Sequence, residues 1–186
     1  MFVLGEGYMN NQTHIRIKTE RLLLRTLTEA DALIIRDLDV TKGEFETEDD
    51  AINWIRWVKE RNDEGRLIII FYIWLTQLNL CIGRVYIHSK PELNGEVEIA
   101  YSINEEQRNK GYATEAAKAV VQYAFEKAAQ EVLVAIVKPD NIPSRRVIEK
   151  LCFTNHGIRI IPDENGIECK FDYFQLSYND WQQIAK

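Results

Sequence analysis

The chain opens with apolar and polar positions arranged in the manner of strands. Two short segments, Ile15–Lys18 and Arg21–Leu27, alternate or run apolar, so we expect a strand at each. Thr28-Glu29-Ala30-Asp31 then supplies an N-cap and early acidic residues, which predict a helix over Glu29–Asp37.

A second helix is predicted to begin near Thr47. Thr47 and Asp50 make a capping-box-like start. The apolar positions that follow recur at helical spacing and share one face. They are Ala51, Trp54, Ile55 and Val58.

From Leu67 the pattern changes to strands. Leu67–Thr76 and Leu80–His88 are rich in Ile, Val, Phe, Tyr and Trp, and Gln77-Leu78-Asn79 joins them, which predicts an antiparallel hairpin. Pro91–Gly95 is a second turn, and Glu96–Ile103 is predicted as the third strand of this meander.

The last third alternates between helix and strand. A long helix is predicted over Thr114–Ala128, a short buried strand over Glu131–Val137 and a short helix over Ser144–Leu151. Phe153–Ile161 and Glu168–Ser177, joined by Asp163-Glu164-Asn165-Gly166, form a closing hairpin. Small residues on the long helix allow it to pack closely on a sheet. They are Ala113, Ala116, Ala117, Val120 and Ala124.

This order of elements predicts an α/β fold, a central mixed sheet with helices on both faces. The helix crossover makes the strands ending near Ile103 and starting near Glu131 parallel, and we expect them to diverge. No repeat or Pro/Gly/Ser-rich linker divides the chain. We therefore predict a single domain over residues 15–186, preceded by Met1–His14 as a loosely held lead-in.

Length and composition narrow the function. A chain of 186 residues with 46% hydrophobic and 28% charged residues suits one well-buried core. A net charge of -6 and a sequence pI of about 5.2 disfavour nucleic-acid binding. The sequence shows neither a signal peptide nor an apolar run of membrane-crossing length, so we expect a cytoplasmic protein without a membrane partner.

The three cysteines, Cys81, Cys152 and Cys169, are far apart, and no C-x-x-C pair or helically spaced His pair occurs. Neither a metal site nor a disulfide framework is predicted, and buried reduced thiols are expected.

Candidate chemistry begins at Gln107–Thr114, between a strand and the long helix. Gly111 permits a tight backbone path, and a helix N-terminus presents unpaired N–H groups that bind phosphate oxygens. Arg108 and Lys110 add cationic donors. The segment predicts an anion site that suits a diphosphate, with a plain structural turn as the alternative. It matches neither a P-loop nor a dinucleotide fingerprint.

Four motifs together resemble the GNAT acetyltransferases. Arg108–Ala113 resembles their R/Q-x-x-G-x-G/A pyrophosphate loop, and Asn141–Phe153 resembles the N-x-x-S-x-x-V-x-E-K-x-G-F run of their RimJ/RimL-like branch. Glu96–Tyr101 is similar to the E-I-G-Y strand, and Thr19–Arg25 to the T-x-R-L-x-L-R start. The motifs occur in the expected order and span most of the chain.

The resemblance implies the acyl-CoA N-acyltransferase fold and direct transfer of an acetyl group from acetyl-CoA to a primary amine, either a protein N-terminus or a small molecule. It also implies a cofactor site in which the backbone of a strand binds the pantetheine and the amides of the loop bind the pyrophosphate. In this site Asn141 reaches the pantetheine from the following loop, and Ser144 lies near the thioester sulfur. The implied residues are Tyr101, Ser102, Ile103, Arg108, Asn109, Lys110, Gly111, Tyr112, Ala113, Thr114, Asn141 and Ser144.

The reaction needs a neutral amine, whereas an alkyl amine with a pKa near ~10.4 arrives protonated. A carboxylate can take that proton, and Glu98 matches the strand glutamate that has this role in the family. Glu96 lies two residues earlier, so its side chain is on the same face of the strand and could share this role. His88 and water are the other possible proton acceptors. A salt-bridged structural role is the alternative for Glu98.

Two departures from the family pattern bear on the mechanism. Ile148 stands where many GNAT enzymes have a tyrosine acid, and in the RimJ/RimL-like branch Ser144 supports the leaving thiolate instead. Capping of the helix is the alternative role for Ser144. Cys152 replaces a glycine, which puts the turn before Phe153 in question, and no neighbouring base supports it as a nucleophile.

Several alternatives stay open at this stage. A non-catalytic acyl-CoA-binding module is the alternative function, favoured only by the absent tyrosine. The acceptor pocket is expected from Asp31–Asn62, where Trp54 and Trp57 lie, together with the closing hairpin. The acceptor amine and a homodimeric state are both undetermined by the sequence.

Overall fold

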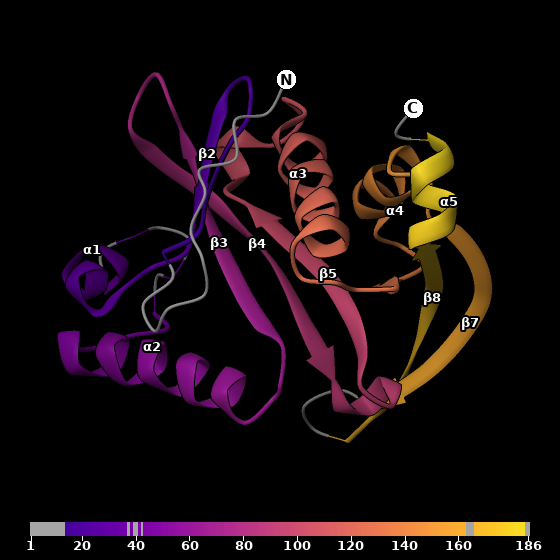
Figure 1. The fold of residues 1–186 in the computed structure, drawn as a ribbon, viewed down its shortest axis with the longest axis horizontal. Helices are drawn as coiled ribbons and strands as arrows, with labels where there is room; N and C mark the ends of the chain where they lie inside the picture. The colour runs from indigo at the N-terminus through magenta and orange to yellow at the C-terminus, as the bar shows by residue number, and fades with distance from the viewer. Residues whose placement is uncertain (1–13, 37, 39–40, 42, 163–165, 185–186) are drawn as a thin grey trace.

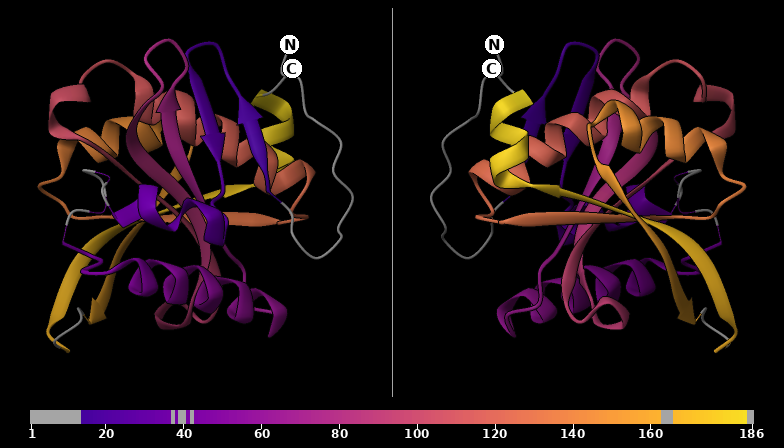
Figure 2. Two further views of the ribbon diagram at one scale, coloured as in Figure 1. Left: turned by 90° about the vertical axis from the view of Figure 1, so that its left-hand side faces the viewer. Right: turned by 90° about the vertical axis from the view of Figure 1, so that its right-hand side faces the viewer.

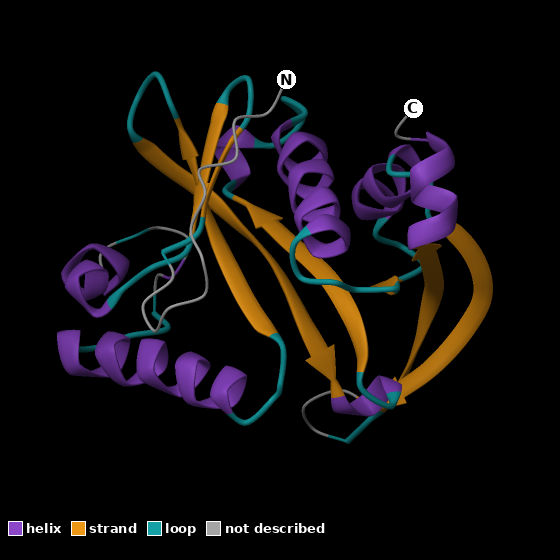
Figure 3. Cartoon of the chain, in the orientation of Figure 1, coloured by secondary structure: helices purple, strands orange, loops and turns teal. Residues whose placement is uncertain are grey.

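The computed structural model describes residues 14–36, 38, 41, 43–162 and 166–184, and its strands form one eight-stranded sheet in the order β1-β2-β3-β4-β5-β6-β8-β7 (Figures 1 and 3). Every neighbouring pair is antiparallel except β5 and β6. The strands are β1 (Arg16–Lys18), β2 (Leu22–Arg25), β3 (Ile68–Leu75), β4 (Leu80–Lys90), β5 (Glu96–Ile103), β6 (Val132–Val137), β7 (Thr154–Pro162) and β8 (Glu168–Ser177).

Helices lie on both faces of this sheet, as predicted. The described helices are α1 (Ala32–Arg36), α2 (Glu48–Asp63), α3 (Tyr112–Glu126), α4 (Ile142–Lys150) and α5 (Tyr178–Ile184), with short 3-10 turns η1 (Glu29–Asp31), η3 (Pro91–Leu93) and η4 (Glu105–Gln107). Figure 1 shows α1 and α2 on one side of β2 to β4 and α3 on the other.

The alternation of β3 explains the two layers. Phe71 and Ile73 join the main core, which includes Val120 and Phe125 of α3. Tyr72 and Trp74 point the other way, into a cluster that contacts Leu27. Leu27 also packs against the cluster formed by α1 and α2. A strand with both faces apolar is therefore buried by helices on each side.

The junction of β5 with β6 confirms the predicted parallel pair. It is joined at a single register position, Glu98 opposite Val134. In Figure 1 the half containing β1 to β5 and the half containing β6 to β8 spread apart, with α3 between them. Figure 2 shows the orange and yellow strands running across the direction of the magenta ones, so the sheet twists strongly here.

Helix ends differ from prediction where the capping residue was not the one expected. Helix α3 begins at Tyr112, two residues early, because Gly111 is its N-cap. Helix α4 begins at Ile142 because Asn141 caps it. Strand β4 continues to Lys90 because β5 pairs with it that far. Helix α5 was not predicted; the Ser177 hydroxyl accepts a hydrogen bond from the Asp180 amide at its start.

Some predictions fall outside the described residues. The lead-in lies almost wholly in residues 1–13, the end of the first predicted helix falls on residue 37, and most of the closing turn falls on residues 163–165. The described part of the first predicted helix is η1 followed by α1.

Cys152 adopts the conformation that the family's glycine would adopt. Its φ is 63°, in the left-handed region. Its amide donates to the Glu149 carbonyl at 2.9 Å, and the Phe153 amide donates to the Ile148 carbonyl at 3.3 Å. These two bonds form a Schellman motif, which ends α4 and turns Phe153 into the core beside Ile148. Cys152 is also exposed and Cys169 is half-buried, so the expectation of buried thiols is confirmed only for Cys81.

We predict that Cys152→Gly stabilises the protein by about 1 kcal/mol, because glycine adopts a left-handed backbone without the Cβ penalty. Urea unfolding measures the change. Cys152→Ala is the matched control, since it removes the thiol but keeps Cβ, and its stability should stay near that of the parent. Equal stabilisation by both variants would show that the thiol, not the backbone, is responsible.

Candidate active site

The loop before α3 has the properties of an anion site. Gly111, the N-cap of α3, has φ 81° and ψ 0°, a left-handed conformation that favours glycine. Among the described residues no side chain caps the helix, and its first described backbone bond runs from the Glu115 amide to the Gly111 carbonyl at 3.1 Å. Unpaired amides in the first turn of a helix are the groups that bind anions at helix N-termini.

The predicted loop residues lie together around these amides. Arg108, Asn109, Lys110 and Gly111 are exposed, and Tyr112, Ala113 and Thr114 are half-buried. Asn109 also has a positive φ, 62°, so the backbone turns sharply twice in three residues. Two exposed cations beside uncapped amides form an environment that fits a diphosphate. A surface depression of about 570 Å³ borders the same stretch and is lined by Leu80, Ser102, Ile103, Asn104, Glu105, Glu106, Gln107 and Arg108.

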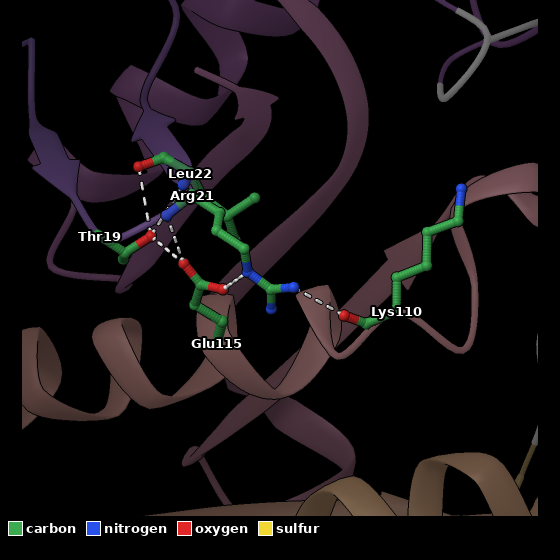
Figure 4. Close-up of polar contacts among 5 residues, drawn as sticks. All are labelled: Thr19, Arg21, Leu22, Lys110 and Glu115. Carbon is green, nitrogen blue, oxygen red and sulfur yellow. Dashed lines mark hydrogen bonds and ion pairs between the residues drawn. The ribbon is translucent and has the colours of Figure 1, made fainter. Parts of the chain in front are cut away.

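The β1–β2 turn is bound to the start of α3 through one carboxylate, that of Glu115 (Figure 4). Its Oε1 accepts hydrogen bonds from the Thr19 hydroxyl at 2.6 Å and the Arg21 amide at 2.9 Å. Its Oε2 forms an ion pair with Arg21 Nε at 2.7 Å. The Arg21 guanidinium also donates to the Lys110 carbonyl at 2.9 Å and lies 4.6 Å from the centre of the Tyr112 ring. We call these contacts the Glu115 clamp.

The clamp gives a physical role to the T-x-R-L motif, which the sequence matched but did not explain. Burial raises the pKa of Glu115, but the hydrogen bonds from Thr19 and Arg21 outweigh it, and the pKa is lowered below 4.5. Glu115 is therefore ionised at neutral pH. The clamp holds the exposed loop from one side while its amides remain open on the other.

Asn141 and Ser144 lie in the first turn of α4. The Asn141 side-chain oxygen accepts a hydrogen bond from the Ser144 amide at 3.2 Å, so Asn141 caps the helix. The alternative in which Ser144 is the cap is therefore wrong. The Ser144 hydroxyl instead lies 3.0 Å from the phenol oxygen of Tyr101 on β5. Ile148 is buried in the core, so the usual tyrosine position on this helix carries no polar group.

Glu98 lies in the sheet at the junction of β5 with β6. It is 6% exposed, and its Oε2 is 3.1 Å from both His88 Nε2 and Lys90 Nζ. Among the described residues, no hydrogen bond or ion pair involves Oε1. The salt-bridged structural role is thus present in the fold, but it occupies only one of the two carboxylate oxygens. His88 lies within β4, directly opposite Glu98, rather than at the strand end that the sequence predicted.

Glu96 is arranged differently. Its Oε1 accepts a hydrogen bond from the Tyr173 phenol at 2.7 Å, and Gln175 donates to that phenol at 2.6 Å. Its Oε2 is buried without a partner among the described residues. Glu96 therefore joins β5 to the closing hairpin and has no solvent-accessible free oxygen like that expected of a base.

Glu98 and Ser144 are not brought into contact. Tyr101, which contacts Ser144, is three positions from Glu98 on β5. The side chains of Tyr101 and Glu98 therefore point to opposite faces of the strand. Sequence reasoning also missed Lys90 as a partner of Glu98, and the phenol of Tyr101, for which only a backbone role was predicted. The cross-strand register of the meander could have identified Lys90 as a partner. When β4 is continued to Lys90, this residue pairs with Glu96 and lies close to Glu98.

The mixed sheet with its single parallel junction is the fold of the acyl-CoA N-acyltransferases. The sequence model described as the acetyltransferase (GNAT) domain matches residues 21–154, and the chain belongs to this family. It is an acetyl-CoA-dependent N-acetyltransferase, and the comparisons give no support to a non-catalytic module.

Relatives and solved structures agree with this assignment. The chain is 30% identical over 179 residues to the uncharacterized N-acetyltransferase YnaD of Bacillus subtilis (strain 168), covering 90% of this chain and 99% of the relative. An acetyltransferase of the GNAT family from Bacillus anthracis is 28% identical with a TM-score of 0.65, covering 89% and 99% of the two chains. The ribosomal-protein-S5-alanine acetyltransferase of Vibrio fischeri shares the fold at 18% identity, with a TM-score of 0.72 and coverage of 90% and 98%.

Two further findings bear on ligands. In the described part of the chain, no helix is long and apolar enough to cross a membrane. No group of three or more His, Cys, Asp and Glu side chains among the described residues is placed to hold a metal ion.

We predict that Gly111→Val weakens acetyl-CoA binding at least about tenfold, because the loop loses the left-handed conformation that aims its amides. Isothermal calorimetry measures the affinity. Gly65→Val is the matched control, since Gly65 has φ 83° and open space around its α-carbon. It should cost similar stability and leave the affinity unchanged. Unchanged affinity in a folded Gly111→Val protein would remove the loop from the phosphate site.

We predict that Glu115→Gln destabilises the protein at pH 7 by about 1.5–3 kcal/mol, the range for a charge-assisted hydrogen bond. The folded-state pKa of Glu115 is lowered, so its contribution is present above 4.5 and is lost as the pH falls through the folded value. The difference between variant and parent should therefore shrink below about pH 4. Glu126→Gln, at the exposed end of α3, should stay within about 0.5 kcal/mol at every pH tested. A pH-independent difference for Glu115→Gln would contradict the clamp's electrostatic origin.

Proposed function

We propose that the chain acetylates a primary amine by direct transfer, with Glu98 as the proton acceptor and Ser144 as the donor that supports the leaving thiolate. The observation that carries the proposal is the state of the Glu98 carboxylate. It is buried at the β5–β6 junction, its Oε2 is held by His88 and Lys90, and its Oε1 is left without a partner among the described residues.

A carboxylate fixed by one oxygen presents the other in a defined direction. Lys90 and His88 orient Glu98 through Oε2, so Oε1 need not be reorganised before it accepts a proton. His88 is itself 28% exposed in its side chain and gives Glu98 a polar neighbour that reaches solvent. Glu96 is less suited to this role, because its free oxygen is fully buried.

The proton balance of the reaction assigns one task to each residue. An alkylammonium ion loses a proton to Glu98 Oε1, directly or through water, and the neutral amine attacks the thioester carbonyl. The C–N bond forms and the C–S bond breaks. The second amine proton ends on the departing sulfur, and the Ser144 hydroxyl donates a hydrogen bond to that sulfur while it carries charge.

The loop before α3 and the backbone of β5 bind the acetyl-CoA in this proposal. In the described part of the chain, the edge of β5 that faces β6 has no strand partner beyond Glu98, so the backbone of Tyr101, Ser102 and Ile103 is available there to an extended pantetheine chain. The uncapped amides at the start of α3 take the pyrophosphate. The Asn141 side chain caps α4, so in this proposal it supports the cosubstrate site by fixing the start of the helix that carries Ser144.

The acceptor is a primary amine, either the N-terminus of a protein or a small molecule. A net charge of -6 favours a cationic acceptor. The acetyltransferase from Vibrio fischeri is named for alanine acetylation of ribosomal protein S5, which supports peptides beginning with alanine as the first set to screen. We place the enzyme in the cytoplasm, where its three free cysteines stay reduced.

We predict that Glu98→Gln lowers kcat by about 10²–10⁴-fold at neutral pH, the usual loss for a general base, with little change in acetyl-CoA affinity. The variant keeps size and hydrogen bonding but removes basicity. Steady-state release of CoA against an amine and peptide panel measures the effect. The loss should shrink at high pH, where free amine is abundant without help.

The controls separate basicity from packing. Glu96→Gln changes a neighbouring, half-buried carboxylate and should leave kcat within a few-fold of the parent. Ser144→Ala should cost less than Glu98→Gln, because water can replace a hydroxyl donor. Full kcat for Glu98→Gln at neutral pH would exclude Glu98 as the base and leave His88 or water.

A further inference from the structure

The contact between Tyr101 and Ser144 joins the two elements on either side of the proposed thioester site. The Tyr101 phenol donates a hydrogen bond to the Ser144 carbonyl oxygen at 3.1 Å, and its oxygen lies 3.0 Å from the Ser144 hydroxyl oxygen, where either group can be the donor. Tyr101 comes from β5 and Ser144 from α4, 43 residues further along the chain. Helix α4 offers no phenol of its own, since Ile148 is buried in the core.

Ser144 is free to use its hydroxyl for something other than capping. Asn141 already satisfies the amide of Ser144. A serine in the first turn of a helix can adopt several staggered rotamers and often turns its hydroxyl back onto nearby backbone. The phenol contacts both Oγ and the carbonyl oxygen of the same residue, so it fixes the side chain relative to its own backbone.

We propose that Tyr101 is a positioning residue for acetyl transfer: its phenol holds the Ser144 side chain in the rotamer that points its O–H at the departing sulfur of CoA. The inference rests on the role proposed for Ser144. The phenol donates to the Ser144 carbonyl oxygen, and sharing the same proton with Oγ in a three-centre bond leaves the serine proton free to face the thiolate. The two hydroxyls then act as a chain of donors, in which the second strengthens the first.

The phenol of Tyr101 is protonated at neutral pH and can donate a hydrogen bond. Burial raises the pKa of Tyr101 to about 12, which the hydrogen bond with Ser144 only partly offsets. A phenol that holds its proton this firmly is suited to position Ser144 through a hydrogen bond.

The first test uses CoA alone and needs no acceptor. The thiol of bound CoA is titrated by its thiolate ultraviolet absorbance, with desulfo-CoA, which lacks the thiol, as the spectral blank. Tyr101→Phe keeps the ring and removes the hydroxyl. We expect it to raise the pKa of the bound thiol by about 0.5–1. Ser144→Ala should raise it at least as much, and the double variant no more than Ser144→Ala alone.

The non-additivity distinguishes positioning from packing. A titration of Tyr101→Phe equal to that of the parent, or single effects that sum in the double variant, would overturn the inference. So would an unchanged titration in Ser144→Ala. Thermal unfolding of each variant identifies any that has not folded, and Tyr101→Trp then provides a second variant that lacks the phenol.

Kinetics give the matching readout. Tyr101→Phe should lower kcat about three- to tenfold with the KM for acetyl-CoA within twofold, and the effect should vanish in a Ser144→Ala background. A rise in KM at constant kcat would indicate a binding role and contradict positioning. If the parent acetylates no amine in the panel, the proposed function fails, but the CoA titration still decides the role of Tyr101.

Discussion

The arrangement of the site depends on one carboxylate, that of Glu115. It accepts hydrogen bonds from the Thr19 hydroxyl and the Arg21 amide in the β1–β2 turn and forms an ion pair with the Arg21 guanidinium. That guanidinium also donates to the Lys110 carbonyl. A helix N-terminus can bind an anion only in the direction in which its amides point. The clamp fixes that direction by tying the first turn of α3 to the far edge of the sheet, more than ninety residues away in sequence. Gly111 then needs no side chain to hold the loop.

Much of this architecture follows from local sequence. The meander of β3, β4 and β5, the crossover through α3 and the closing hairpin all follow from apolar periodicity, because each strand has one or both faces buried. Helix ends were harder to predict, since they depend on which polar residue caps the helix: Asn141 rather than Ser144 for α4. The Glu115 clamp was not predictable from spacing. Its members are far apart in sequence, and nothing in Thr19 or Arg21 alone identifies the partner.

In the candidate site, too, local sequence indicated which residues to consider, whereas their arrangement depends on contacts between distant parts of the chain. The motifs identified Glu98, Ser144 and the loop, but not how they relate in space. Glu98 lies on one face of β5 and Ser144 against the other, so in the proposed mechanism the acetyl group is handled at the edge of the strand, where both faces can be reached. That edge is open because β5 and β6 separate there. Lys90 and Tyr101 gained their roles from cross-strand register and helix packing, which a one-dimensional pattern does not contain.

The single register pair between β5 and β6 has a consequence for how the protein responds to its cosubstrate. Two half-sheets that share one pair are joined by a narrow strip of backbone, and no other pair between β5 and β6 occurs in the described residues. A ligand whose extended arm forms hydrogen bonds along the seam between β5 and β6 adds contacts that hold the two half-sheets together. Such a ligand binds the folded chain and not the unfolded one. It therefore raises the free energy of unfolding, and above its Kd this increase grows with the logarithm of the ligand concentration. A CoA thioester bound along this seam would thus be a structural component of the folded state as well as a substrate.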